Sequence, residues 1–424
     1  MSFQQGLSGL NAASRSLETI GNNVANANTV GFKGSQAQFA DVYASSLTGA
    51  GGSQIGIGTK VSQIFQQFTQ GNITASNNPL DVAINGGGFF RMSTNGTISY
   101  TRNGQFQLDR EGFIVNASGA RLTGYTADMR GVLSTGAPGE INISTADLAP
   151  QATSSVTAQI NLDSRMDVPE VTPFDIDEPL SYNSSSSVTV YDSLGNAHVM
   201  QSYYVKTSTP GQWEVYASCD GVLLPPVAPA VTPGRVGTLQ FNGDGILTSP
   251  ITPLNLSIDL NAVAAGQTPP ETNNATAILP IELDYEGSTQ FGASFGVRKL
   301  VQDGFTSGRL SAFNIGADGI ITGRYTNGES ATLGQIVLAN FTNPNGLQPL
   351  GNNLWAESST SGSPLVGTPG ASNMGVLQAS SVEDSNVDLT AELVNMITAQ
   401  RVYQANAQTI KTQDQVLQTL VNLR

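Results

Sequence analysis

Few residues in this 424-residue chain have the chemistry of a nucleophile, an acid–base group or a metal ligand. The segment Gly292 to Gly296 matches the G-x-S-x-G pattern of serine hydrolases, with Ser294 at its centre. That mechanism requires a strand–turn–helix around the serine and a histidine that accepts its proton. The single histidine, His198, lies far upstream of Ser294, and no helical pattern follows Gly296. The sequence therefore argues against a hydrolase.

The remaining candidate sites have simpler interpretations. The run Gly86 to Gly88 lacks the lysine of a phosphate loop, and Asn242 to Gly245 lacks the closing glutamate of a calcium loop, so both are interpreted as turns. Glu383 and Asp384 lie in a polar segment and are expected to be solvated. One cysteine, Cys219, and one histidine do not predict a zinc cluster. We expect no enzyme activity, no cofactor and no bound metal.

Charge and hydropathy exclude further classes of partner. The formal net charge is −14 and the few lysines form no basic run, so no nucleic-acid surface is expected. The sequence has no apolar run of about 18 residues, so no membrane insertion is expected. The N-terminus lacks the basic start and apolar stretch of a cleavable secretory signal. A protein that lacks this signal either stays inside the cell or leaves it by another export route.

At both chain ends, apolar residues are spaced as in helices that pack along other helices. No Gly or Pro follows Gly375, and residues 386–423 would form a helix about 57 Å long, with Ser385 and Asp388 available to cap it. Seven-residue spacing predicts a coiled coil between the two ends, with a helical hairpin in a globular core as the alternative. The predicted interface positions are Phe3, Leu7, Leu10, Leu17 and Val24 at one end and Leu389, Leu393, Met396, Tyr403, Ile410 and Leu417 at the other.

A dense asparagine cluster ends the N-terminal apolar stripe, at Asn22, Asn23, Asn26 and Asn28. Asparagine competes for backbone hydrogen bonds and tolerates left-handed backbone, so a helix terminus suits it. The cluster is interpreted either as a C-cap or as a set of amide hydrogen bonds between subunits. Residue chemistry leaves both interpretations open.

The chain between the ends has the pattern of β-structure. All 20 prolines lie between Pro79 and Pro369, and Asn95-Gly96 and Asn103-Gly104 separate short alternating segments, which predicts hairpins. The Gly- and Ser-rich stretch 47–58 predicts an extended connector. The predicted fold class is mixed, mainly β: a terminal α-helical coiled coil plus two β-domains, the second inserted into the first. The predicted parts are the helical coiled-coil domain, 1–30 with 385–424; the connector, 31–76 with 372–384; the β-domain, 77–150 with 290–371; and the inserted outer β-domain, 151–289.

Long ordered motifs at both ends resemble the bacterial flagellar rod and hook protein family. The N-terminal motifs are 8–12, 20–28 and 31–33, the C-terminal motifs are 385–389, 399–401, 404–407 and 412–414, and segments 88–90, 100–106 and 122–125 resemble the shared β-domain. Segments 190–198 and 343–347 resemble the hook members rather than the shorter distal rod members. The family-motif residues singled out at the two ends are Asn22, Asn23, Asn26, Asn28, Gly31, Phe32, Gln400, Arg401 and Asn406.

This resemblance implies a structural subunit that self-assembles into a tubular joint transmitting motor torque from rod to filament. The terminal helices would line the inner tube, and the β-domains would lie outside it. The implied partners are further copies of the chain, the rod protein, the hook cap, the hook–filament junction proteins and the flagellar type III export apparatus. The implied location is the extracellular hook. The alternatives are a distal rod-type axial protein and, from another class, a secreted adhesin-like β-protein with an aromatic groove at Tyr203, Tyr204 and Trp213.

Overall fold

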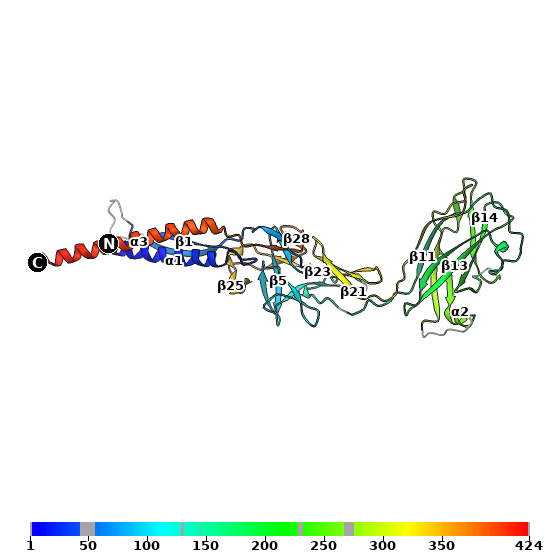
Figure 1. Ribbon diagram of the computed structural model, residues 1–424, viewed down its shortest axis with the longest axis horizontal. Coiled ribbons are helices and arrows are strands. Elements are labelled where there is room, and N and C mark those ends of the chain that lie inside the picture. The colour runs from blue at the N-terminus through cyan, green and yellow to red at the C-terminus, as the bar shows by residue number, and fades with distance from the viewer. Residues whose placement is uncertain are drawn as a thin grey trace. The chain divides into compact units, whose positions relative to one another are not determined.

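The computed structural model describes residues 2–42, 56–128, 131–144, 146–227, 232–266 and 275–422. The chain forms two compact units: unit 1 comprises residues 1–145, 312–323 and 330–424, and unit 2 comprises residues 146–311 and 324–329. The fold is mainly β with a helix at each end of the chain, which confirms the predicted fold class (Figure 1). Most of the predicted Gly- and Ser-rich stretch, residues 47–55, lies outside the described residues.

The two terminal helices are α1 (Ser2–Ala25) and α3 (Leu389–Asn422), and they pack against each other. At about 1.5 Å per residue they are about 36 and 51 Å long. Helix α3 confirms the predicted long C-terminal helix but begins at Leu389 rather than at residue 386. Asp388 is the N-cap of α3, because its Oδ1 accepts hydrogen bonds from the amides of Thr390 (2.8 Å) and Ala391 (3.1 Å). The positive end of the helix dipole also stabilises the negative charge of the Asp388 carboxylate.

Unit 1 contains several antiparallel strand systems, apart from residues 310–311 of β21 and 324–325 of β22, which belong to unit 2. Strand β1 pairs with β2, β3 with β29 and β4 with β28, while a 13-stranded sheet has the main order β21-β22-β23-β9-β5-β6-β26-β25. The strands are β1 (Ser35–Val42), β2 (Gly58–Gln66), β3 (Ile73–Ala75), β4 (Val82–Asn85), β5 (Phe89–Thr94), β6 (Thr97–Thr101), β7 (Gln107–Leu108), β8 (Ile114–Val115), β9 (Arg121–Thr126), β10 (Gly139–Glu140), β21 (Leu310–Ile315), β22 (Ile320–Tyr325), β23 (Ser330–Ile336), β24 (Leu338–Asn340), β25 (Gln348–Gly351), β26 (Leu354–Ala356), β27 (Leu365–Gly367), β28 (Val376–Ala379) and β29 (Ser381–Glu383), with a 3₁₀ turn at Pro344–Gly346.

The predicted Asn-Gly turns have two different outcomes. Asn95 (φ 50°) and Gly96 (φ 85°) form the tight turn between β5 and β6, where Thr94 pairs with Thr97, as predicted. Asn103-Gly104 is not a hairpin turn. The Gly104 carbonyl instead accepts a hydrogen bond from the amide of Val82, and a Cβ at Gly104 would collide with the Val82 backbone. Glycine is required there for close backbone approach.

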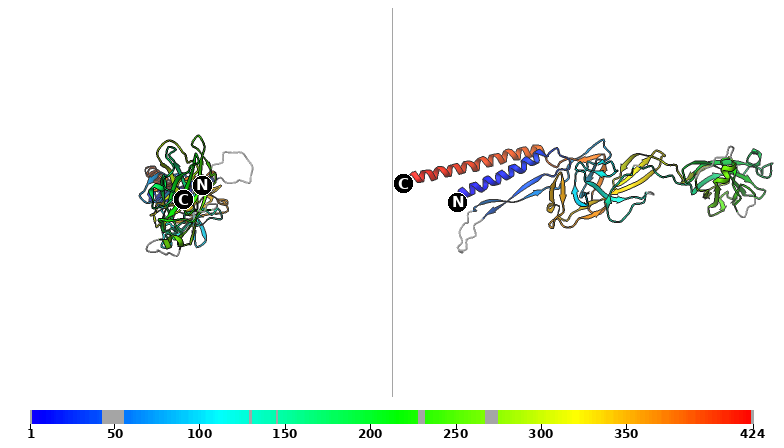
Figure 2. Two further views of the ribbon diagram at one scale, coloured as in Figure 1. Left: turned by 90° about the vertical axis from the view of Figure 1, so that its right-hand side faces the viewer. Right: turned by 90° about the horizontal axis from the view of Figure 1, so that it is seen from below.

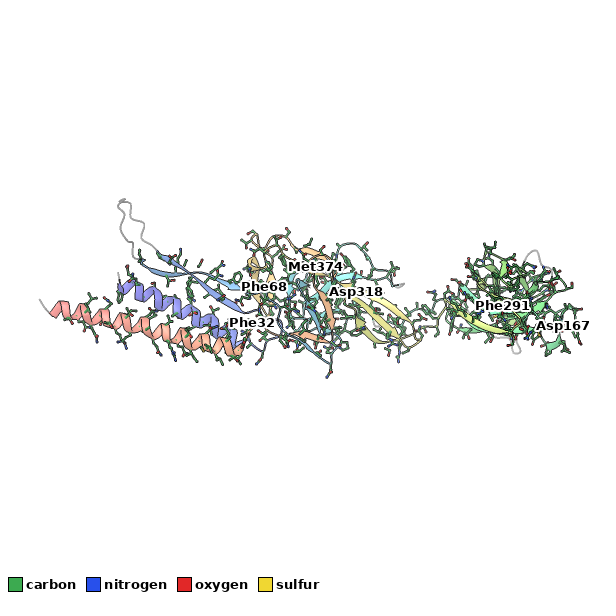
Figure 3. All side chains as sticks on the ribbon, turned by 90° about the horizontal axis from the view of Figure 1, so that it is seen from above. Phe32, Phe68, Asp167, Phe291, Asp318 and Met374 are labelled. Carbon is green, nitrogen blue, oxygen red and sulfur yellow. The ribbon has the colours of Figure 1, made fainter. Side chains whose placement is uncertain are left out.

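An aromatic cluster forms the core of unit 1 next to the β1–β2 hairpin. Phe68, which Figure 3 labels, packs edge-on against Phe89 and Trp355 with ring centroids 5.4 and 5.5 Å apart. The Trp355 indole donates a hydrogen bond to the Gln66 side chain at the end of β2 (2.9 Å). These contacts attach the hairpin to the large sheet.

Unit 2 is built from two sheets that share one hydrophobic core. The six-stranded sheet has the main order β12-β13-β14-β16-β17, and the four-stranded sheet has the order β18-β19-β11-β20. β20 lies beyond residue 289, the predicted end of the inserted domain, and pairs with β11 inside it. The predicted domain boundaries stay a prediction. The elements are β11 (Ser155–Asn161), a 3₁₀ turn (Pro179–Ser181), β12 (Ser184–Tyr191), β13 (Ala197–Lys206), β14 (Gln212–Cys219), β15 (Val222–Leu223), β16 (Arg235–Phe241), β17 (Leu247–Ser249), β18 (Leu254–Asp259), α2 (Leu260–Gly266), β19 (Ile278–Asp284) and β20 (Gly296–Gln302).

Candidate assembly surface

The seam between α1 and α3 is formed largely by small side chains. A Cβ added at Gly9 would lie 2.8 Å from Oδ1 of Asn406, and one added at Gly6 would lie 3.1 Å from Cγ1 of Ile410. Ala13 on α1 and Ala399 on α3 are buried. Small residues let the two backbones approach closely, and close packing supplies the dispersion contacts that hold the helices together.

Most of the predicted interface positions with seven-residue spacing lie outside this seam. Ile410 meets α1 at Gly6. The expectation that the rows pack against each other within one chain is wrong for most positions, because small residues occupy the seam and leave the larger apolar side chains outside it. Of the predicted interface residues, Phe3, Leu7, Leu389, Leu393, Tyr403 and Leu417 are exposed, and Leu10, Leu17, Val24, Met396 and Ile410 are half-buried.

Helix α3 consequently carries an uncovered apolar surface along its length. Leu393 is 45% exposed, Ile397 is 51% exposed and Leu417 is 54% exposed. Large apolar side chains exposed along a helix make it a candidate interaction surface. We call it the α3 apolar surface; within the described residues its exposed members are Leu389, Leu393, Val394, Ile397, Val402, Tyr403, Val416 and Leu417.

The β1–β2 hairpin lies beside α1, as Figure 2 shows. The Gln5 side chain donates to the carbonyl of Gly56 (2.6 Å), and the Ser8 hydroxyl accepts from the amide of Thr59 (3.3 Å). An open groove of about 850 Å³ lies between α1, β1 and α3. Its lining combines small and polar residues with larger apolar ones, among them Ser16 on α1, Phe39 on β1 and Val402 on α3.

A buried charge cluster joins the segments next to the two helices. Lys33 Nζ lies 2.7 Å from Glu383 Oε1, and Arg102 Nε lies 3.1 Å from Glu383 Oε2. The side chains of Lys33 and Glu383 are fully buried, and that of Arg102 is 4% exposed. Burial lowers the pKa of Lys33 against the opposing attraction of Glu383, and burial also lowers the pKa of Arg102. Two cations therefore share one carboxylate away from water.

Backbone groups complete the coordination of this cluster. Lys33 donates to the carbonyl of Thr69 (2.8 Å), and Arg102 donates to the carbonyls of Gly88 (2.7 Å) and Gly86 (2.9 Å). Glu383 Oε1 accepts from the amide of Gly71 (2.9 Å). The expectation that Glu383 is solvated is wrong. Its place before α3 is polar in sequence, but strand pairing of β29 with β3 turns the side chain inward.

The asparagine residues of the family motifs form bonds inside the chain. Asn23, 3% exposed, donates to the carbonyl of Ser35 (2.7 Å) and accepts from its amide (2.9 Å). Asn26 donates to the carbonyl and side chain of Asn22, and its backbone amide also bonds to that carbonyl. Asn386 accepts from the amide of Gly34 (2.8 Å). Asn23 and Asn26 therefore have cap and tertiary roles within one subunit.

The other family-motif residues have varied environments. Gly31 has φ +71°, and a Cβ there would lie 2.6 Å from the backbone nitrogen of Asn103, so only glycine fits. Phe32, labelled in Figure 3, is half-buried. Asn406 contacts α1 at Gly9. The remaining members, Asn22, Asn28, Gln400 and Arg401, are exposed.

Sequence reasoning missed the buried charge cluster as a site. Lys33 belongs to the quoted motif Gly31-Phe32-Lys33, and it is one of very few lysines in the chain. That scarcity is the signal the sequence offers for this residue, because a lysine that becomes buried needs a charged partner. The sequence does not predict that Lys33 pairs with Glu383 or lies near Arg102, because the three residues are far apart in the chain.

The residues considered for chemistry have structural roles. Gly296 begins β20 rather than a helix, so the segment around Ser294 lacks the strand–turn–helix of a hydrolase. Asn242 Oδ1 accepts from the amides of Asp244 (3.0 Å) and Ile246 (2.9 Å), which makes the segment a turn. The aromatic side chains Tyr203, Tyr204 and Trp213 are 3%, 0% and 0% exposed, so they belong to the core rather than to a groove. Among the described residues, no helix has the length and apolar character needed to cross a membrane.

Four family models match successive parts of the chain. The flagella basal body rod protein model matches residues 3–33, and the flagellar hook protein FlgE/F/G D1 domain model matches residues 83–166. The flagellar basal body protein FlaE D2 domain model matches residues 161–305, and the flagellar basal body rod FlgEFG protein C-terminal model matches residues 378–423.

Curated relatives are similar over their full length. Flagellar hook protein FlgE of Salmonella typhimurium is 46% identical over 432 residues, and that of Escherichia coli K12 is 44% identical over 430 residues, with 100% of both chains covered. The Borreliella burgdorferi protein of the same name is 33% identical, covering 100% of this chain and 99% of the relative. The crystal structure of Helicobacter pylori flagellar hook protein FlgE2 is similar in fold, with a TM-score of 0.50 and 16% identity over 73% of this chain and 100% of that one. On these full-length similarities, the chain belongs to the flagellar hook protein FlgE family.

Proposed function

We propose that this protein is the structural subunit that self-assembles into the tubular flagellar hook, and that the α3 apolar surface is a principal contact between copies. The observation that carries the proposal is the exposure of large apolar side chains along α3, which α1 leaves uncovered. Because each of them is already about half buried, burying the rest on a neighbouring copy would contribute roughly 1 kcal/mol apiece before ordering costs are subtracted. Repeated over many copies, such contacts stabilise a polymer.

The terminal helices supply the rigid part of this polymer. Packed helices resist shear because their side chains are close-packed, so an inner tube built from α1 and α3 would transmit torque from the rod to the filament. The β-structure outside that tube would form the weaker contacts that slide as the joint bends. The buried cluster of Lys33, Arg102 and Glu383 supports this division, since it joins the segments next to both helices to the large sheet.

Assembly and ordering of the ends are coupled in this proposal. Helices with a poorly covered apolar face gain much of their stability from packing, so docking onto neighbouring copies would complete their folding. The proposed partners are the rod protein below, the hook cap during growth, the hook–filament junction proteins above and the flagellar type III export apparatus. The proposed location is the extracellular hook. No catalytic role is proposed.

The test compares two aspartate substitutions on α3 at exposed positions. Leu393→Asp places a charge in the α3 apolar surface, whereas Gln408→Asp places the same charge at an exposed polar position of the same helix. After salting-out, electron microscopy and sedimentation should show tubes for the wild type and the Gln408 variant, and soluble protein for the Leu393 variant. The core of unit 2, reported by Trp213 fluorescence, should be unchanged in all three. Wild-type polymer formation by Leu393→Asp would exclude this surface as a contact.

A further inference from the structure

The single histidine and the single cysteine of the chain meet in unit 2. Cys219 is the last residue of β14 and pairs with Met200 on β13. His198 lies two residues before Met200, so its side chain is on the same face of the sheet as Cys219. Asp220 follows at the turn into β15, and ligand atoms of His198, Cys219 and Asp220 all lie within 4.8 Å of one another.

Carboxylates flank both ring nitrogens of this histidine. Asp220 Oδ2 lies 2.7 Å from Nδ1, while Oδ1 of the same residue accepts a hydrogen bond from the amide of Val199 (2.7 Å). Asp192, whose side chain is fully buried, places Oδ2 3.6 Å from Nε2. Nε2 is buried and has no hydrogen-bond partner among the described residues. A buried polar atom without a hydrogen bond costs free energy. A shift of the ring proton from Nδ1 to Nε2 would give Nε2 a hydrogen to donate toward Asp192 and would recover part of that cost.

We propose that His198, Cys219 and Asp220 form a binding site for a borderline divalent cation of the zinc type. Imidazole nitrogen, thiolate sulfur and carboxylate oxygen are the donors that Zn²⁺ prefers, whereas Ca²⁺ and Mg²⁺ prefer oxygen alone. The cation replaces the proton between Nδ1 and Asp220. The ring proton then lies on Nε2, where Asp192 accepts it and orients the ring.

The balance of protons sets the conditions for binding. The thiol of Cys219 loses its proton to solvent when the cation binds, while the imidazole stays neutral with its proton on the other nitrogen. Burial, and secondarily Asp220, raises the pKa of Cys219 to about 12, so the cation must displace a firmly held proton. The side chains of His198 and Asp220 are 14% and 20% exposed, which leaves an approach for the ion and for a water as fourth ligand.

The decisive experiment titrates the purified full-length protein with Co²⁺, a spectroscopic substitute for Zn²⁺. One equivalent should produce the near-ultraviolet charge-transfer absorption of a cobalt–thiolate bond, and Zn²⁺ should abolish it. Cys219→Ser should lose this absorption, and Asp192→Asn should weaken binding by about 10–100-fold. Ser218→Ala is the matched control, because it removes a neighbouring buried hydroxyl that has no hydrogen-bond partner in the described part of the chain. Absence of the absorption in the wild type, or its presence in Cys219→Ser, would overturn the proposal.

A measurement that changes none of the proposed ligands guards against ligand variants that fail to fold. The chain has two tryptophans, Trp213 in unit 2 and Trp355 in unit 1, and both are buried. Zn²⁺ that binds only the native site should raise the melting temperature of unit 2 and leave unit 1 unchanged. Trp355→Phe and Trp213→Phe variants report the two units separately. An equal shift in both units, or no shift, contradicts a specific site in unit 2.

Discussion

Lys33 and Glu383 are 350 residues apart in sequence, yet they form an ion pair of 2.7 Å with both side chains fully buried. One residue follows α1 and the other precedes α3, so the contact joins the two ends of the chain. Arg102 from the end of β6 shares the same carboxylate. The cluster thus contains two cations and one anion, and its energetics depend on which charge is removed.

Removal of the shared carboxylate should be far more costly than removal of one cation. Glu383→Gln leaves two buried cations without a counter-charge and should lower the free energy of unfolding of unit 1 by about 3–5 kcal/mol. Lys33→Met leaves the Arg102–Glu383 pair and should cost much less. Urea unfolding followed by Trp355 fluorescence in a Trp213→Phe background measures unit 1 alone.

The matched control for this comparison is the exposed pair of Arg15 and Glu18 on α1, whose side chains are 63% and 59% exposed. Glu18→Gln removes the same kind of charge and should change the free energy of unfolding by less than about 1 kcal/mol. Equal effects of Lys33→Met and Glu383→Gln would contradict the view that the carboxylate neutralises both cations.

Alkaline pH should destabilise unit 1 through Tyr100. Burial, and next the nearby Glu357, raises the pKa of Tyr100 from 10.0 to about 12. The folded state then holds its phenolic proton at pH values where the unfolded chain has released it. The stabilising contribution is complete below pH 10 and is lost as the pH rises toward about 12. Tyr100→Phe should therefore lose less stability than the wild type over this interval, measured by urea midpoints. Parallel curves for the two proteins would show that Tyr100 is not the responsible group.

Gly31 should tolerate no side chain, for two separable reasons. Its φ of +71° disfavours any residue with a Cβ, and that Cβ would lie 2.6 Å from the Asn103 backbone nitrogen. Gly96 has a similar φ of +85° with nothing within 4 Å, so Gly96→Ala isolates the conformational cost of about 1–2 kcal/mol. Gly31→Ala should cost clearly more in urea unfolding of unit 1. Equal costs would mean that the backbone at Asn103 yields without penalty.

Local patterns predict the elements of this fold better than their packing. The absence of Gly and Pro after Gly375 and the capping residue Asp388 predict α3, and Asn95-Gly96 predicts its hairpin, because these signals act between neighbours in sequence. The seam between α1 and α3 could not be read in this way. Seven-residue spacing recurs on every face of a helix and favours the row of larger residues, whereas Gly9 and Ala399 allow the closer approach.

For the candidate site, too, the sequence predicts features that depend on neighbouring residues, but it does not predict contacts between segments far apart in the chain. The motif residues at the chain ends are recognisable in the sequence, but the partners of Lys33 and Asn23 depend on how the ends return to each other. Polarity alone suggested that Glu383 faces water. The pairing of β29 with β3 decides otherwise, and such pairing between distant segments has no signal in a single sequence.

Asn23 should be essential for docking the β1–β2 hairpin onto α1. The side chain of Asn23 donates a hydrogen bond to the backbone carbonyl of Ser35 at the start of β1 and accepts one from the backbone amide of the same residue. Its Nδ2 also lies 3.4 Å from Oε1 of Glu392 on α3. Asn23→Ala removes both partners of Ser35 and should cost about 1–3 kcal/mol. Asn23→Asp replaces the donor by a carboxylate facing a carbonyl and Glu392, and should cost at least as much. Hydrogen exchange at the Ser35 amide in the assembled protein measures the effect directly.

Asn22 provides the control for this last comparison, since it is exposed on the adjacent position of the same helix. Asn22→Ala should change the exchange rate of the Ser35 amide little, with a free-energy change within about 0.5 kcal/mol. If Asn23→Ala leaves that amide as protected as in the wild type, the hairpin is held by its other contacts, such as the bond from Gln5 to Gly56. Asn23 would then serve contacts between copies rather than the fold of one chain.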